Sequence, residues 1–161
     1  MEDVFQKLIL MIRAYYPVLY LHSYEYYRTK QKIKGIVELL RREGKKVNYY
    51  QWDCVYGLVQ ILPDKTEKRI ERMQNPLEVL AYILNSKKSG EKNIFVLDDI
   101  NNHIDRDEVK LMFRKIAEAT NNNTHAIILS SIYRPSFLLY TRQQSLIFRL
   151  PIFQLPALSC H

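Results

Sequence analysis

Short apolar runs alternate with amphipathic segments along most of the chain, and this alternation limits the folds open to it. Runs rich in Val, Ile, Leu and Tyr predict five strands, at residues 17–22, 46–52, 93–98, 125–130 and 145–151. Apolar residues spaced three and four apart predict four helices, at residues 2–14, 26–43, 75–85 and 105–120. Strands that alternate with helices of this length indicate an α/β fold, a three-layer sandwich around a mostly parallel five-stranded sheet.

One segment breaks the alternation. Residues 53–75 contain Gly57, Pro63 and the charged run DKTEKRIERM, which fit either a hairpin or a charged loop insertion. The total length of 161 residues is that of one ordinary domain. We therefore expect a single domain over residues 1–161, with residues 53–75 as its one irregular part.

Composition narrows the classes of protein further. A hydrophobic content of 47% with 25% charged residues excludes a disordered chain, and the net charge of +7 permits acidic partners such as nucleic acid. The apolar runs are much shorter than the roughly 20 residues of a membrane-spanning helix, so we expect no membrane insertion. Acidic Glu2 and Asp3 stand where a secretory signal would be basic, which predicts a cytoplasmic or equivalent intracellular location.

Polar residues follow several of the predicted strands. In parallel sheets ligands bind outside the carboxyl ends of the strands, so this edge is the place to look for a site. The candidate nucleotide edge consists of His22, Ser23, Asp98, Ser130 and Ser131. A lone histidine with two aspartates lacks a third ligand, so we expect packing or a hydrogen bond for His22 and no metal.

The strongest motif is IFVLDD at residues 94–99, a pattern of four apolar residues and two acids called Walker B. In such a motif the first carboxylate, here Asp98, holds magnesium, and the second, here Asp99, orients the attacking water. Asp98, Asp99 and Ser130 are thus the catalytic candidates, and Asp98 is the metal candidate. The alternative for the two acids is a helix cap beside a solvated carboxylate.

The order of motifs after this strand resembles the AAA+/RecA-like core. A strand ending in Ser130 and Ser131, the pair Arg134-Pro135, and a last strand IFRLPIFQLP follow one another as they do in AAA+ ATPases. The beginning YYPVLYLHSYEYYR and the segment NPLEVL at residues 75–80 are similar to the degenerate N-terminal AAA-like domain of the chloroplast and cyanobacterial AAA-type ATPase family, whose role is unsettled.

Three departures from the active pattern bear on function. A working phosphate loop needs G-x-x-x-x-G-K and then Ser or Thr, because bare backbone N–H groups must wrap the phosphates. At that place this chain reads HSYEYYRTK, with no glycine and three tyrosines. Asp99 is one methylene shorter than the glutamate usual at its position. The sequence ends at His161, where the helical lid of an AAA+ protein would begin, so we expect a core without the lid.

The resemblance, with these losses, implies a catalytically silent, pseudo-ATPase domain that acts as a protein-interaction or assembly module and needs no cofactor. Arg134 and Arg142 lie near the region where active relatives pass an arginine to a neighbouring subunit, and they are the candidates for self-association or for contact with a protein partner. The missing phosphate loop favours a protein that is not an enzyme, although the Walker B-like pair Asp98 and Asp99 is retained. An alternative is a magnesium-dependent NTPase that binds ATP through an atypical phosphate loop.

A second alternative is a nucleic-acid-binding module with a basic, tyrosine-rich face. Cations at both ends of one predicted helix could contact phosphates, and neighbouring tyrosines could stack on bases. The candidates are Tyr26, Tyr27, Arg28, Lys30, Lys34, Arg41, Arg42, Lys45 and Lys46. The competing interpretation is an ordinary solvated helix face with cations near its C-terminus.

Overall fold

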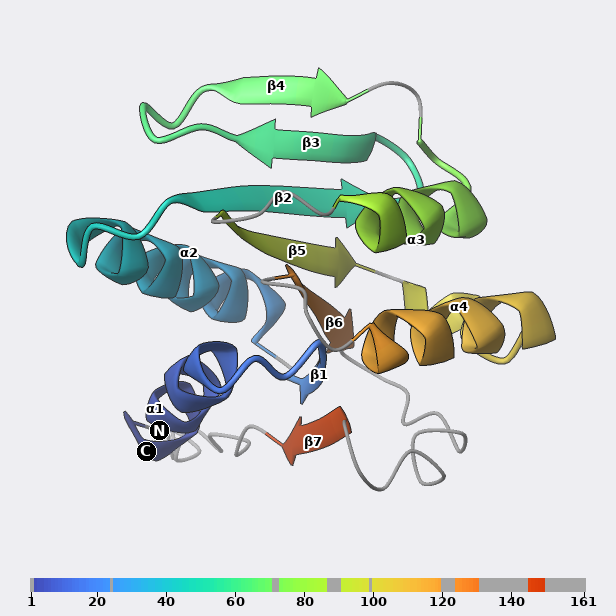
Figure 1. Cartoon of the computed structure of the whole chain (residues 1–161), viewed down its shortest axis with the longest axis horizontal. Coiled ribbons are helices and arrows are strands. Elements are labelled where there is room, and N and C mark those ends of the chain that lie inside the picture. The colour runs from blue at the N-terminus through green and yellow to red at the C-terminus, as the bar shows by residue number, and fades with distance from the viewer. Residues whose placement is uncertain are drawn as a thin grey trace, which may run out of the picture.

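The computed structural model of the chain describes residues 2–23, 25–70, 73–86, 91–98, 100–119, 124–130 and 145–149. The helices are α1 (Glu2–Arg13), α2 (Tyr26–Arg42), α3 (Pro76–Asn85) and α4 (Asp107–Glu118), with a short 3-10 turn η1 (Ile100–Asn102). The strands are β1 (Val18–His22), β2 (Val47–Asp53), β3 (Gly57–Ile61), β4 (Glu67–Ile70), β5 (Lys92–Asp98), β6 (Thr124–Ser130) and β7 (Ser145–Arg149) (Figure 1).

The strands form one sheet in the order β4-β3-β2-β5-β6-β1-β7. The sequence predicted five of these strands: β1, β2, β5, β6 and β7. Every pairing between two of these five strands is parallel, which confirms the mostly parallel core. Two further strands lie within residues 53–75, for which the sequence allowed either a hairpin or a charged loop. β3 pairs antiparallel with β2, and β4 pairs antiparallel with β3. The described sheet is therefore seven-stranded, two strands wider than expected.

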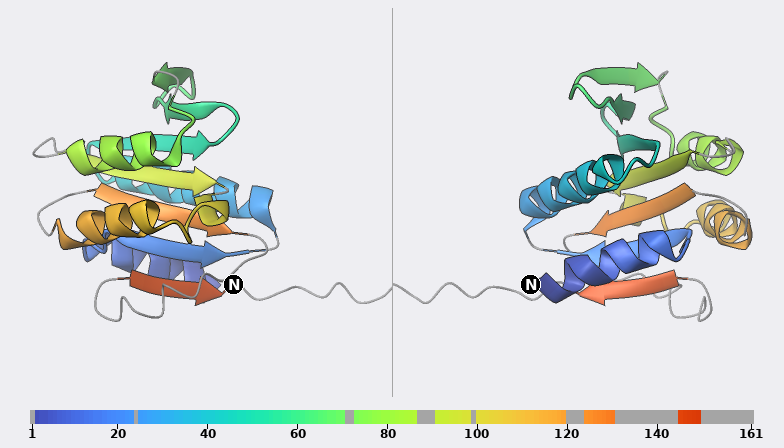
Figure 2. Two further views of the ribbon diagram at one scale, coloured as in Figure 1. Left: turned by 90° about the vertical axis from the view of Figure 1, so that its right-hand side faces the viewer. Right: turned by 60° about the vertical axis from the view of Figure 1, so that its left-hand side comes forward.

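Among the described elements, α1 and α2 cover one face of the sheet and α3 and α4 cover the other, which gives the three layers (Figure 2). Alternate residues of a strand point to opposite faces, so neighbours in sequence enter different cores. Phe95 and Leu97 of β5 pack with α3 and α4, whereas Ile94 and Val96 pack with α1 and α2. All seven residues of β5 are buried, as a central parallel strand covered on both faces must be.

Local sequence signals account for the helix ends. The Asn75 side chain accepts a hydrogen bond from the backbone N–H of Leu77 at 3.0 Å, and Pro76 occupies the first helical position of α3. Gly44 follows α2 with a φ of +77°, a left-handed conformation that suits glycine and ends the helix.

The β2–β3 hairpin is tied to the segment before α3. The Trp52 indole N–H donates to the carbonyl of Met73 at 2.6 Å. Gly57 begins β3 with a φ of +78°, and a Cβ there would stand 3.2 Å from the same Met73 carbonyl oxygen. This position thus requires glycine both for its backbone conformation and for the close approach of residue 73. The contacts fix where the hairpin leaves the parallel core.

Candidate functional site

The parallel register sets the order of polar residues along the carboxyl edge of the sheet. Asp98 ends β5, Ser130 ends β6 and His22 ends β1, and β6 lies between the other two strands. His22 is in register with Ser130 on one side and with Arg149 of β7 on the other. Asp98 and His22 therefore share the edge but do not stand on neighbouring strands. For Ser130 the structure describes the backbone position.

The carboxylate of Asp98 forms an ion pair with Lys30, across 68 residues of sequence. Lys30 Nζ lies 2.6 Å from Asp98 Oδ2, and the two side chains are 23% and 4% exposed. Lys30 belongs to α2, which starts directly after β1, so its ammonium reaches the carboxyl edge from the place where a phosphate loop would stand. A lysine thus contacts the carboxylate that would hold a divalent cation in a Walker B motif.

The connection between β1 and α2 is only three residues long, residues 23–25. The Ser23 side chain holds it in place: the buried Ser23 hydroxyl accepts from the Glu25 backbone N–H at 3.1 Å and from the Thr29 hydroxyl at 2.8 Å. Thr29 also reaches the carbonyl of Glu25 at 2.9 Å. A G-x-x-x-x-G-K loop spans seven residues whose backbone N–H groups surround phosphates, and a three-residue connection has no such span.

Tyr26 and Tyr27, the two described tyrosines after β1, do not share one location, and Tyr24 lies outside the described residues. Tyr26 is half-buried against the core formed by α1 and α2, and its ring centroid lies 5.4 Å from Lys30 Nζ. Tyr27 is 75% exposed. The Lys30–Asp98 pair and the short connection therefore occupy the place where a phosphate loop would stand, and Tyr27 points to solvent.

Four of the seven predicted nucleic-acid cations on α2 or just after it are engaged within the domain. Arg28 pairs with Glu25, Lys30 with Asp98, and Lys45 with Glu43. Arg41 is the most buried of them: its guanidinium donates to the carbonyls of Val47 at 3.1 Å and Ile61 at 3.3 Å and pairs with Glu38 at 3.0 Å. It ties the end of α2 to β2 and β3, a structural role that sequence reasoning missed. Arg42, Lys46 and half-buried Lys34 lie on the same helix or just after it.

Four predicted site residues, Asp99, Ser131, Arg134 and Arg142, lie outside the described residues. Within the described ranges, no group of three or more His, Cys, Asp or Glu side chains could hold a metal ion. None of the helices in those ranges is both long enough and apolar enough to cross a membrane.

A rigid apolar turn also lies on the carboxyl edge, at the β2–β3 hairpin. Asp53 Oδ1 accepts from the backbone N–H groups of Val55 at 2.8 Å and Tyr56 at 2.7 Å, and Gln74 Nε2 donates to the Val55 carbonyl at 2.7 Å. The side chains of Val55 and Tyr56 are 64% and 63% exposed. A turn with three side-chain hydrogen bonds thus presents two large apolar groups to solvent.

At the opposite, amino edge a buried cation joins α1 to the sheet. Lys92 Nζ donates to the Ile12 carbonyl at 2.8 Å, lies 3.2 Å from His125 Nε2, and stands 4.8 Å from the centroid of the Tyr15 ring. His125 Nδ1 donates to the Tyr16 carbonyl at 2.7 Å, so Nε2 is the acceptor. Burial lowers the pKa of Lys92 to about 8 and the pKa of His125 to about 4.

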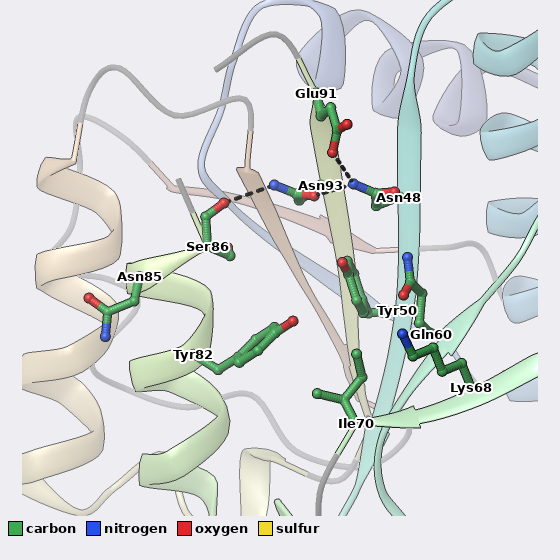
Figure 3. Close-up of a pocket in the computed structure, with 10 residues that line it drawn as sticks. All are labelled: Asn48, Tyr50, Gln60, Lys68, Ile70, Tyr82, Asn85, Ser86, Glu91 and Asn93. Carbon is green, nitrogen blue, oxygen red and sulfur yellow. Dashed lines mark hydrogen bonds between the residues drawn. The ribbon is translucent and has the colours of Figure 1, made fainter. Parts of the chain in front are cut away.

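A pocket near this amino edge was also missed by sequence reasoning (Figure 3). It lies between α3 and the β3–β4 hairpin, over the beginnings of β2 and β5. Its residues could be named only once the charged segment 53–75 was known to fold into strands beside β2.

Parallel strands with a carboxylate at the carboxyl edge, covered by helices on both faces, define the chain as an AAA+-like α/β domain. Residues 4–138 match the family model of the SpoVK-like AAA ATPase N-terminal domain, and the chain belongs to this family. No curated protein matches the sequence of this chain.

Several solved structures share parts of this fold at low sequence identity. A chain of the Drosophila ORC bound to DNA is 16% identical with a TM-score of 0.44, and the match covers 83% of this chain and 36% of that one. S. cerevisiae Dbp5 bound to RNA and ADP-BeF3 is 15% identical with a TM-score of 0.37, and the match covers 92% of this chain and 39% of Dbp5. The chain therefore spans less than half of each of these solved chains.

Proposed function

We propose that this domain is a catalytically silent, pseudo-ATPase member of its family that acts as a protein-interaction or assembly module. The observation that carries the proposal is the Lys30–Asp98 ion pair. For Asp98 to hold magnesium, the cation would have to displace Lys30 from a carboxylate that is almost fully buried. Lys30 and the cation thus compete for the same carboxylate, and this competition opposes magnesium binding at Asp98.

The short β1–α2 connection supports the same proposal. Phosphates of ATP are held by several backbone N–H groups that point into a wide loop, together with a lysine. Here the N–H of Glu25 is already bound by Ser23, and the lysine is already bound by Asp98. We therefore expect neither ATP nor magnesium as a cofactor. The narrower resemblance to the degenerate domain of the chloroplast and cyanobacterial family agrees with this expectation.

The interaction role draws its support from the apolar turn. Large side chains that are exposed yet rigidly held lose little conformational entropy on binding, and tyrosine is enriched among residues that dominate protein interfaces. Val55 and Tyr56 lie on the same edge of the sheet as Tyr27 at the start of α2. This edge is thus suited to a protein partner or to a second copy of the domain.

Calorimetric titration with ATP and ADP, with and without magnesium, tests the absence of nucleotide chemistry. We expect no heat of binding up to millimolar nucleotide for the unmodified protein. Magnesium-dependent binding that disappears in Asp98→Asn would contradict the proposal and favour an NTPase with an atypical phosphate loop. Asp53→Asn is the matched control, because it removes a carboxylate from the same edge without touching the Lys30 pair.

Sedimentation velocity tests the assembly role. If the domain assembles through this edge, Val55→Ser with Tyr56→Ser will shift a discrete oligomer toward monomer, and Leu111→Ser, a control at an exposed leucine of α4, will not. An oligomer that is unaffected by the double variant would exclude the turn as the assembly surface.

A further inference from the structure

The pocket near the amino edge of the sheet has the size of a ligand site. Its volume is about 580 Å³, within the range of roughly 300–1,000 Å³ typical of small-molecule pockets. The floor comes from β2 and β5, one wall from α3 and the other from β3 and β4 (Figure 3). It lies at the opposite end of the strands from Asp98, so it is distinct from the candidate nucleotide edge.

A hydrogen-bonded network holds the polar end of the pocket in place. Asn48 Nδ2 donates to Glu91 Oε2 at 2.9 Å and to Asn93 Oδ1 at 3.0 Å. Asn93 Nδ2 in turn donates to the carbonyl of Ser86 at 3.0 Å, immediately after α3. The Glu91 carboxylate is thus oriented by a neutral amide, and no cation among the described residues pairs with it. An oriented carboxylate that no cation of the described ranges neutralises is suited to an ammonium group of a ligand.

The other end of the pocket carries a positive charge. Lys68 of β4 lies beside Gln60 of β3, on the far side of the pocket from Glu91 (Figure 3). Among the described residues, none forms an ion pair or hydrogen bond with the side chain of Lys68 or of Gln60. The pocket therefore presents one cation and one anion at opposite ends, with carboxamides of Asn48, Gln60 and Asn85 along its lining.

Packed aromatic rings form the apolar middle of the pocket, between Glu91 and Lys68. The Tyr50 ring stacks on Phe95 with centroids 4.4 Å apart and planes 9° from parallel. Tyr82 of α3 approaches Tyr50 edge-on, with centroids 6.2 Å apart. Burial is the main cause that raises the pKa of Tyr50 to about 12, so its hydroxyl stays neutral at physiological pH. The middle of the pocket is thus uncharged and able to pack against apolar groups.

We propose that this pocket binds a short zwitterionic peptide, with its amino terminus at Glu91 and its carboxyl terminus at Lys68. Carboxamides carry both a donor and an acceptor, as each peptide group does, and they would pair with the peptide backbone. A nucleotide fits less well, because its phosphates would add negative charge to a pocket that already holds Glu91. The inference goes beyond the proposed function and does not depend on whether nucleotide binds at the other edge.

Residue-resolved NMR titration of the ¹⁵N-labelled protein tests the peptide site, with trialanine, N-acetyl-trialanine and trialanine amide as probes. We expect trialanine to shift the amides of Asn48, Gln60 and Asn93. Blocking either terminus should weaken its binding by about threefold or more, because each blocked terminus loses one ion pair. Lys68→Ala should remove the difference between trialanine and its amide, and Glu91→Gln the difference between trialanine and its acetylated form.

Arg69→Ala is the matched control for Lys68→Ala, because the next residue on a strand points to the opposite face of the sheet. It should leave trialanine binding unchanged. The proposal is wrong if trialanine causes no shifts at these amides, if both blocked peptides bind as well as the free one, or if Arg69→Ala weakens binding as much as Lys68→Ala. Tighter binding of adenosine than of trialanine at the same amides would also overturn the ligand class.

Discussion

Single buried residues make the stability of this domain depend on pH. His125 is fully buried with its Nδ1–H donated to Tyr16 and its Nε2 facing the Lys92 ammonium. Protonation of Nε2 would bring two cations together in a desolvated position. Burial, aided by Lys92, therefore lowers the pKa of His125 from 6.5 to about 4.

The unfolded chain binds this proton at higher pH than the folded chain does. Between about pH 6.5 and pH 4 the unfolded state thus gains the proton first, and the free energy of unfolding falls as the pH falls. The full effect is on the order of 3 kcal/mol. We expect His125→Gln, whose amide can donate to Tyr16 and accept from Lys92, to lose less stability over this range than the unmodified protein does.

Urea unfolding followed by the fluorescence of Trp52, the single tryptophan, measures this difference at pH 7, 5 and 4. His103→Gln is the control, because it removes a histidine that lies after η1 and outside the Lys92 contact. If the unmodified protein and His125→Gln lose stability in parallel, the histidine is not the group that responds to acid.

At the scale of elements, Arg41 joins the end of α2 to two strands. Its guanidinium satisfies the carbonyls of Val47 on β2 and Ile61 on β3, so Arg41→Ala leaves both acceptors without this donor. We expect a loss of about 1–3 kcal/mol in the free energy of unfolding. Arg41→Lys should recover only part of it, because an ammonium lacks the fork that reaches two separate carbonyls.

Arg42 provides the comparison, since it is the adjacent arginine on the same helix and is exposed. Arg42→Ala should change the free energy of unfolding by no more than about 0.5 kcal/mol. Equal losses for the two alanine variants would show that Arg41 contributes only through helix propensity or charge.

The same scale separates what the sequence could predict from what it could not. The parallel strands were predictable because a strand such as β5 is buried on both faces and has a continuous apolar run from Ile94 to Leu97. β4 was not, because its residues Glu67 to Ile70 are almost all charged and exposed. Its strand state is set by pairing with β3, a tertiary effect that local periodicity does not carry.

At the candidate site, the sequence did not predict contacts between residues that are far apart in the chain. The carboxyl edge and Asp98 followed from strand ends alone. The pairing of Asp98 with Lys30 did not, because Lys30 was interpreted as part of a basic helix face. One signal could have indicated it: in the predicted fold, a lysine in the second turn after the first strand and an acid at the end of a central strand approach the same edge. The pocket required the β3–β4 hairpin and could not be predicted without it.

For the whole molecule, the net charge of +7 leaves nucleic-acid binding as a prediction to test. If net charge alone drives DNA binding, the affinity depends on how many lysines and arginines the protein has and not on where they lie. Because half of the six cations of α2 form ion pairs within the domain, we expect only weak binding of single-stranded DNA at about 50 mM salt, lost by about 200 mM. Fluorescence anisotropy with a labelled oligonucleotide measures this.

Two triple variants with the same change of charge separate a binding face from diffuse attraction. The first removes Lys34, Arg42 and Lys46 at α2, and the second removes Lys68, Arg69 and Arg114 elsewhere on the domain. With each residue changed to alanine, both should weaken DNA binding equally, because only the total charge matters. If the α2 variant alone loses most of its affinity and its salt dependence falls by about three phosphate contacts, the helix is a true nucleic-acid interface. Lys34, Arg42 and Lys46 would then be the residues that contact the phosphates.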